Sequence, residues 1–219
     1  MSTYPTPLTK ELYGYLLDFT IDSDDLLELI TKDAVEKGFP AIYISSEQAA
    51  FLLFLIKLLD AKLVVEIGTL FGYSAISMAK ALPDGGRLIS VEKDPKAASL
   101  AAANALKTGL HCKIDVVNMD GSEYLRGFKP DKPIDLVFLD ADKQHYSEYL
   151  SLAAPLIRRG GVIAADNAFA FGEIVSANPT HSPETIKAIH EFNIKLKSDS
   201  RFYTCLLPVG DGLIMGVKI

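Results

Sequence analysis

The chain has 219 residues, of which 49% are hydrophobic, and a formal net charge of −6. This length suits one domain, residues 1–219, and the negative charge gives no general attraction for nucleic acid or an anionic membrane. The N-terminal residues lack a signal-peptide pattern, the apolar run Ala49 to Leu59 is too short to cross a bilayer, and the two cysteines have no metal-binding spacing. We therefore expect a soluble, cytoplasmic protein without membrane contact.

Residues 1–60 carry helical patterns only and form an N-terminal addition. Thr6 and Pro7 predict the start of a first helix, because proline is tolerated at the first helical position. A second helix is predicted after Asp22–Asp25. Ser45 and Gln48 predict a capping box, in which each side chain bonds an unpaired N–H at the start of the following apolar helix.

In residues 61–219, short apolar runs alternate with helical stretches, a pattern typical of a parallel sheet covered on both faces. Pro208–Gly212 predicts a hairpin, so the last strand is expected to run antiparallel to its neighbour. The sequence thus predicts an α/β fold with added N-terminal helices. The predicted strands are Leu63–Ile67, Leu88–Val91, Ile114–Val117, Ile134–Leu139, Val162–Ala165, Phe202–Leu207 and Leu213–Val217, and the helices are Tyr73–Ala81, Pro95–Lys107, a short piece near Ser122, and Tyr146–Ile157.

Ligands of such sheets bind at the carboxyl ends of the strands. The first predicted strand contains Glu66 and leads into Gly68 and Gly72, which allow the backbone to approach a ligand closely. Glu92 ends the second strand, where a carboxylate can accept hydrogen bonds from both hydroxyls of a ribose. Small and acidic residues at 118–122 follow the third strand and could face an adenine. These residues favour a nucleoside cofactor without naming it, and ordinary turns or NAD remain alternatives.

The fourth and fifth predicted strands end in oxygen-bearing side chains. Asp140 follows one strand, and Asp166 and Asn167 follow the next. Because neighbouring strands lie about 5 Å apart, the three side chains can converge and suit a hard cation such as Mg²⁺. The alternative is that these acids cap helices. Lys143 lies one turn from Asp140 and could act as a general base near a cation, or form an ion pair with Asp140 or Asp142.

Together these segments resemble the cation-dependent O-methyltransferases, a family that includes plant caffeoyl-CoA O-methyltransferases and is related to catechol O-methyltransferases. The resemblance implies a Rossmann-like, seven-stranded methyltransferase sheet and S-adenosylmethionine as cofactor. It also implies a divalent cation, Mg²⁺ or else Mn²⁺ or Ca²⁺, and a homodimer. It covers nearly the whole chain, and the segments that carry it are Leu12–Leu17, Val65–Ser74, Leu139–Lys143, Asp166–Asn167 and Leu207–Gly212.

The resemblance also implies the roles of individual residues. Lys143 matches the catalytic base, and Asp140, Asp166 and Asn167 match the metal ligands. The residues that match cofactor contacts are Ile44, Glu66, Gly68, Thr69, Ser74, Glu92, Gly121, Ser122, Asp140 and Asp142.

The implied activity is O-methylation of a catechol-like small molecule with two neighbouring hydroxyls. Phe171 stands where plant relatives carry a polar residue, which indicates an apolar wall and argues against caffeoyl-CoA itself. One alternative is a tRNA hydroxyuridine O-methyltransferase, although the acidic charge argues against a nucleic-acid partner. Another is a nicotinamide-dependent oxidoreductase, although a third glycine is missing and Asp140, Asp166 and Asn167 would be unexplained.

Overall fold

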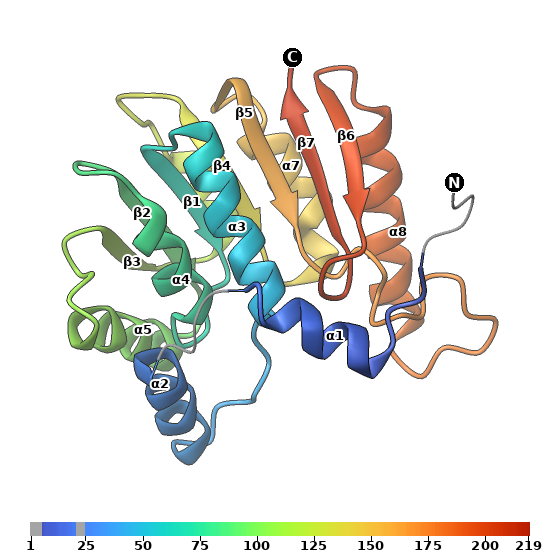
Figure 1. Ribbon diagram of the computed structural model, residues 1–219. Helices are drawn as coiled ribbons and strands as arrows, with labels where there is room; N and C mark the ends of the chain where they lie inside the picture. The colour runs from blue at the N-terminus through green and yellow to red at the C-terminus, as the bar shows by residue number, and fades with distance from the viewer. Residues whose placement is uncertain (1–5, 21–24) are drawn as a thin grey trace.

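The computed structural model describes residues 6–20 and 25–219, which form a central sheet with helices on both faces (Figure 1). None of the described helices is long and apolar enough to span a membrane. The helices are α1 (Lys10–Leu17), α2 (Asp25–Glu36), α3 (Ser46–Leu59), α4 (Tyr73–Ala81), α5 (Pro95–Lys107), α6 (Gly121–Gly127), the 3₁₀ turn η1 (Lys143–His145), α7 (Tyr146–Ala153) and α8 (Pro183–Ser198). The strands are β1 (Leu63–Ile67), β2 (Arg87–Glu92), β3 (Ile114–Asn118), β4 (Ile134–Leu139), β5 (Ile157–Ala165), β6 (Phe202–Leu207) and β7 (Leu213–Lys218).

The seven strands lie in the order β3-β2-β1-β4-β5-β7-β6. Neighbouring strands from β3 to β5 are parallel, and β7 runs antiparallel to both β5 and β6. The predicted seven-stranded, mostly parallel sheet with an antiparallel C-terminal strand is therefore confirmed. The order places β1 and β4 side by side at the centre, with connections leaving them in opposite directions, and ligands bind at such a position in open α/β sheets.

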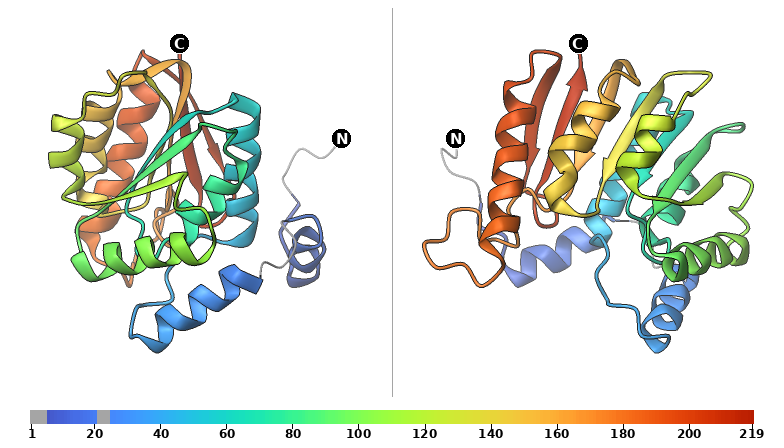
Figure 2. Two further views of the ribbon diagram at one scale, coloured as in Figure 1. Left: turned by 90° about the vertical axis from the view of Figure 1, so that its left-hand side faces the viewer. Right: turned by 180° about the vertical axis from the view of Figure 1, so that it is seen from behind.

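Two apolar layers hold the helices against the sheet. On one face, α3 and α4 pack on side chains such as Val64 and Leu136. On the other face, α7 and α8 pack on side chains such as Val137 and Ile163, and Figure 2 shows these two helices from behind. Both faces of the central strands are covered, which explains why their sequences are continuously apolar rather than alternating.

The N-terminal helices differ in detail from the prediction. Helix α1 begins at Lys10 rather than at Thr6 and Pro7, because the Thr9 side chain accepts a hydrogen bond from the Leu12 N–H and caps the helix there. Helix α2 exists as predicted, but residues 22–24 of its predicted start lie outside the described residues.

The capping box predicted for α3 is wrong. Ser45 is the residue before the helix, but its hydroxyl bonds no helix N–H. Gln48 is buried and lies against Gly210 of the β6–β7 turn, so it does not reach back to the helix start. The helix itself forms and buries an apolar stripe that includes Leu52 and Ile56.

The elements on either side of β5 also differ from the prediction. The predicted helix Tyr146–Ile157 ends at Ala153, because Ile157 already pairs with Ile134 as the first residue of β5. Helix α8 has no counterpart among the predicted elements. Its start carries a recognisable signal, since the Ser182 side chain accepts from the Thr185 N–H.

Candidate active site

The strand register brings the predicted site residues together at one edge of the sheet. In the β4–β5 pair, Leu139 lies opposite Ala165, so Asp140 and Asp166 follow adjacent strand ends. The Asp166 N–H donates to the Leu139 carbonyl at 3.0 Å, and the Asp140 N–H donates to the Ile67 carbonyl at 2.9 Å. The ends of β1, β4 and β5 are thus joined by backbone hydrogen bonds, which fix these side chains relative to one another.

The loop after β1 is shaped by close backbone contact. Gly68 has φ +91°, and a Cβ on it would overlap the backbone oxygen of Asp140, so only glycine fits. The Glu92 carboxylate accepts the N–H groups of Thr69 at 3.2 Å and Leu70 at 3.0 Å. Glu92 therefore holds the glycine loop in place and keeps further lone pairs for a ligand.

Glu66 lies near the end of β1, just before this loop, and is fully buried. Burial raises the pKa of its carboxyl to about 7, against the lowering influence of the hydroxyls of Ser74, Ser90 and Thr69. The Ser90 hydroxyl donates to one carboxyl oxygen at 2.5 Å, whereas the other oxygen, Oε1, has no hydrogen-bond partner. A buried acid with one unpaired oxygen is a group that a cationic ligand would stabilise in its ionised form.

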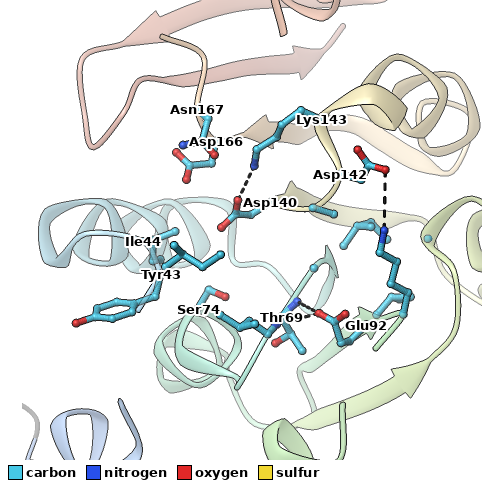
Figure 3. Close-up of a pocket in the computed structure, with 18 of the residues that line it drawn as sticks. Tyr43, Ile44, Thr69, Ser74, Glu92, Asp140, Asp142, Lys143, Asp166 and Asn167 are labelled. Carbon is cyan, nitrogen blue, oxygen red and sulfur yellow. Dashed lines mark hydrogen bonds and ion pairs between the residues drawn. The ribbon is translucent and has the colours of Figure 1, made fainter. Parts of the chain in front are cut away.

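A cavity of about 520 Å³ opens along these strand ends (Figure 3). Two predicted residues, Glu66 and Ser122, do not line it, and both are buried. The predicted residues that line it are Ile44, Gly68, Thr69, Ser74, Glu92, Gly121, Asp140, Asp142, Lys143, Asp166 and Asn167. The structure therefore gathers nearly the whole predicted set around one space.

Lys143 forms an ion pair with Asp140, which is one of the alternatives that the sequence left open. Its Nζ donates to Asp140 Oδ1 at 2.8 Å and to the Tyr146 hydroxyl at 2.8 Å. Burial lowers the pKa of Lys143, but Tyr146 and the Asp140 carboxylate outweigh it and hold that pKa above its ordinary value. Asp142 is paired elsewhere, with His145 Nδ1 at 3.0 Å and Lys93 Nζ at 3.9 Å.

Asp166 lies at the same end of the cavity as Asp140 and Asn167 (Figure 3). Burial, followed by the charge of Asp140, raises the pKa of Asp166 to about 6. Its Oδ1 atom is buried and has no hydrogen-bond partner within 3.5 Å, although the Gln48 side-chain amide is near enough to lower the pKa of Asp166 somewhat. An unpaired buried carboxylate oxygen facing a second carboxylate is a costly arrangement that a bound cation would relieve.

These residues fit a divalent cation by their chemistry. Asp140 and Asp166 offer carboxylate oxygens and Asn167 an amide oxygen, which are ligands that hard cations prefer. Within residues 6–20 and 25–219, no group of three or more His, Cys, Asp and Glu side chains is placed to hold a metal. Any cation at this site would therefore be held by two carboxylates, the amide, and oxygens from outside the chain.

Two residues that contact the predicted site residues were not identified from the sequence. Tyr146 donates to the Leu139 carbonyl at 3.0 Å while it accepts from Lys143, and it was seen only as the start of a helix. Asp211 accepts a hydrogen bond from the Asn167 amide at 3.1 Å. Tyr146 lies three residues after Lys143, a spacing that could have indicated a contact. Asp211 belongs to the segment Leu207–Gly212 that carries the resemblance, but it is far from Asn167 in sequence, so no local pattern indicated their contact.

Aromatic side chains form part of the cavity wall. Phe171, predicted as an apolar wall, lines the cavity with 40% of its surface exposed. Its ring stacks on His181, with ring centroids 4.3 Å apart. Tyr43 and Tyr73 also line the cavity, with centroids 4.7 Å apart. The same cavity therefore offers aromatic surfaces for a planar apolar group as well as the carboxylates.

Comparison with known proteins gives a consistent result. The sequence model of a family described as O-methyltransferase matches residues 18–219. The catechol O-methyltransferase of Niastella koreensis is 36% identical over 93% of this chain and 90% of its own length, and a probable caffeoyl-CoA O-methyltransferase of Dictyostelium discoideum is 33% identical over 93% and 91%. The O-methyltransferase of Bacillus cereus, solved in complex with SAH, superposes with a TM-score of 0.86 at 30% identity, covering 94% of this chain and 96% of that one.

Proposed function

Since the chain belongs to the O-methyltransferase family, we propose that it methylates one oxygen of a catechol-like small molecule, with S-adenosylmethionine as donor and a divalent cation as helper. The observation that carries this proposal is the unpaired Oδ1 of Asp166 beside Asp140, at one end of a cavity whose other end is the Gly68 loop and Glu92. The nicotinamide-dependent alternative is set aside by the family assignment.

The cofactor end of the cavity suits S-adenosylmethionine. Glu92 has lone pairs for ribose hydroxyls, and the unpaired oxygen of Glu66 lies close behind the loop that would carry the methionine portion. Asp140 and Asp142 would face the positive sulfonium, which supplies an electrophilic methyl group. The Bacillus cereus relative was solved with SAH, the demethylated product, which supports the same use of this end.

The cation end would be built by Asp140, Asp166 and Asn167. A bound cation, Mg²⁺ in the first instance and Mn²⁺ or Ca²⁺ otherwise, would neutralise the two carboxylates, orient two neighbouring acceptor oxygens, and favour loss of a proton from one of them. This role explains why an acceptor with vicinal hydroxyls fits better than a single phenol.

Lys143 is proposed as the group that takes the proton from the acceptor hydroxyl. Its side chain is only 12% exposed, and its Nζ is held by Asp140 and the Tyr146 hydroxyl. Because Asp140 and Tyr146 hold the pKa of Lys143 above its ordinary value, Nζ is protonated in this state. A cation bound at Asp140 would weaken that ion pair and favour the neutral amine, which would then accept the acceptor's proton while bound S-adenosylmethionine would supply the methyl group. Phe171 and the tyrosine pair would hold the acceptor ring and exclude water, so positioning contributes much of the rate.

The test is methyl transfer from labelled S-adenosylmethionine to catechol, caffeate and caffeoyl-CoA, with Mg²⁺ or with EDTA. We expect transfer to a small catechol that EDTA abolishes and added Mg²⁺ restores. Transfer unaffected by EDTA would remove the cation from the proposal. Absence of transfer to every acceptor, with labelling of unmodified tRNA instead, would replace the catechol with the tRNA alternative.

We further propose a homodimer in a reducing, cytoplasmic setting. Phe54 and Leu58 on α3 and Tyr203 on β6 are each more than 60% exposed, and large exposed apolar groups are typical of interfaces. Cys112 and Cys205 are exposed and unpaired, as expected where thiols stay reduced. Light scattering of the purified protein tests the dimer, since a monomer mass at micromolar concentration would exclude it.

A further inference from the structure

Asp211, in the turn between β6 and β7, gathers three hydrogen bonds from the loop that follows β5. Its Oδ2 accepts from the Asn167 side-chain amide at 3.1 Å and from the Phe171 N–H at 2.6 Å. Its Oδ1 accepts from the Gly172 N–H at 3.0 Å. One carboxylate therefore contacts both a proposed cation ligand and the backbone of the aromatic wall.

The turn that carries Asp211 is fixed against this loop. The Ala168 N–H donates to the Gly212 carbonyl and the Phe169 N–H to the Asp211 carbonyl, each at 2.9 Å. A Cβ on Gly212 would lie 2.8 Å from the Phe169 ring, so the two segments are in close contact there. The carboxylate has little freedom to move away from its three donors.

The carboxylate determines which way the Asn167 amide points. An ionised carboxylate only accepts hydrogen bonds, so the Asn167 NH₂ group must face Asp211 and its oxygen must face away. Asn167 lines the cavity next to Asp166, and its backbone is left-handed, with φ +60°, which asparagine tolerates better than most residues. A cation requires the oxygen, because an amide NH₂ cannot serve as a ligand.

The same carboxylate also sets the wall of the acceptor site. Phe171 has φ +61°, an uncommon conformation for a bulky residue, and its N–H is held by Asp211. The following residue, Gly172, is held by the other oxygen. The Phe171 ring can line the cavity because its backbone is held in this unfavourable conformation.

We propose that Asp211 is a positioning residue that turns the Asn167 amide oxygen toward the cation and holds Phe171 against the acceptor. This inference rests on the proposed cation dependence. It adds a residue to the proposed site, because Asp211 is not itself a cation ligand but orients Asn167, the one neutral ligand.

The experiment measures Mn²⁺ affinity by titration of the full chain with SAH present, in the wild type and in D211N, N167D, N167D/D211N and D166A. Substituting Asp211 by Asn lets the Asn167 amide rotate and turn its NH₂ to the cation. We expect D211N to weaken Mn²⁺ binding about 10-fold or more, as losses of ligand-orienting partners commonly do. SAH affinity should stay unchanged.

Reversing the pair distinguishes orientation from general damage. In N167D, two carboxylates face each other without a donor, and N167D/D211N restores a donor at position 211. We therefore expect D211N to weaken Mn²⁺ binding when residue 167 is Asn, and to preserve or strengthen it when residue 167 is Asp. If D211N alone fails to fold, the comparison of N167D with N167D/D211N decides the proposal.

E173Q is the matched control. Glu173 belongs to the same loop and accepts four hydrogen bonds from Thr180 and His181, but none from the proposed cation ligands. Loosening the loop in this way should leave Mn²⁺ affinity within about twofold of the wild-type value. This is smaller than the change expected when a contact that orients a metal ligand is lost.

Four results would overturn the inference. If D211N reduced Mn²⁺ affinity equally whether residue 167 is Asn or Asp, Asp211 would be a purely structural residue. The same conclusion would follow if E173Q reduced Mn²⁺ affinity as much as D211N does. Unchanged Mn²⁺ affinity in D211N, with binding abolished in D166A, would refute the role of Asp211 while keeping the cation site. Absence of Mn²⁺ binding in the wild type would remove the cation proposal together with this one.

Discussion

Replacing Glu66 by Gln should make the cofactor-free protein more stable at alkaline pH. The pKa of Glu66 rises from 4.5 to about 7 on folding, first because of burial. The folded state therefore holds this proton more tightly than the unfolded chain. At about 1.4 kcal/mol per pH unit, the difference corresponds to about 3 kcal/mol of folding free energy. This contribution is fully present below pH 4.5 and is lost as the pH rises through about 7.

The glutamine side chain does not ionise in this pH range, so the stability of E66Q should not fall for this reason as the pH rises. Urea unfolding of both proteins at about pH 5 and about pH 8.5 gives the difference in unfolding free energy at each pH. We expect the difference to move in favour of E66Q by about 2.5 kcal/mol between the two pH values, because part of the contribution is already lost at pH 5. Effects of lost packing are the same at both pH values and cancel.

If the difference in unfolding free energy between the wild type and E66Q stayed constant with pH, the reasoning would be refuted. Such a result would mean that folding does not raise the pKa of Glu66. A second measurement connects the result to function. If Glu66 meets a cationic part of the cofactor, S-adenosylmethionine should stabilise the wild type more than E66Q at about pH 8.5, since binding then favours the ionised carboxylate. Equal stabilisation would remove Glu66 from the cofactor site.

Three further predictions concern the strand ends. Gly68→Ala should destabilise the fold by about 3 kcal/mol or more in urea unfolding, because its Cβ would overlap the Asp140 backbone at a positive φ; a loss below about 1 kcal/mol would contradict the close contact. Asp166→Ala should abolish cation-dependent methyl transfer while SAH affinity, measured by calorimetry, is retained; normal transfer in EDTA would contradict the assignment. Lys143→Ala should lower kcat about 100-fold or more with little change in SAH affinity, and an unchanged kcat at saturating acceptor would exclude Lys143 as the base.

The sheet and most of the site were predictable because both follow from local patterns. Buried parallel strands are continuously apolar, and the residue after each run necessarily lies at the carboxyl edge. Asp140 and Asp166 could therefore be placed side by side before their register was known, and the Leu139–Ala165 pair places them there.

What could not be predicted depends on contacts between distant segments. The start of α1 was misplaced because Thr6 and Thr9 are both acceptable caps, and only the folded chain shows which one bonds a helix N–H. The spacing of Gln48 fitted a capping box, but in the folded chain its side chain packs against Gly210 instead. In both cases a tertiary or competing local contact outweighed a weak local preference.

The position of the cavity follows from the point where the strand order reverses. Strands β1 and β2 supply the Gly68 loop and Glu92, and β4 and β5 supply Asp140 and Asp166, so the two proposed ligand ends lie on opposite sides of the β1–β4 boundary. Asp140 lies at this boundary, with its backbone against Gly68 and its carboxylate bound to Lys143. A displacement of Asp140 would therefore disturb both ends at once. Variants at Gly68 should lose SAH affinity and Mn²⁺ affinity together, whereas variants at Asp166 should lose Mn²⁺ affinity alone.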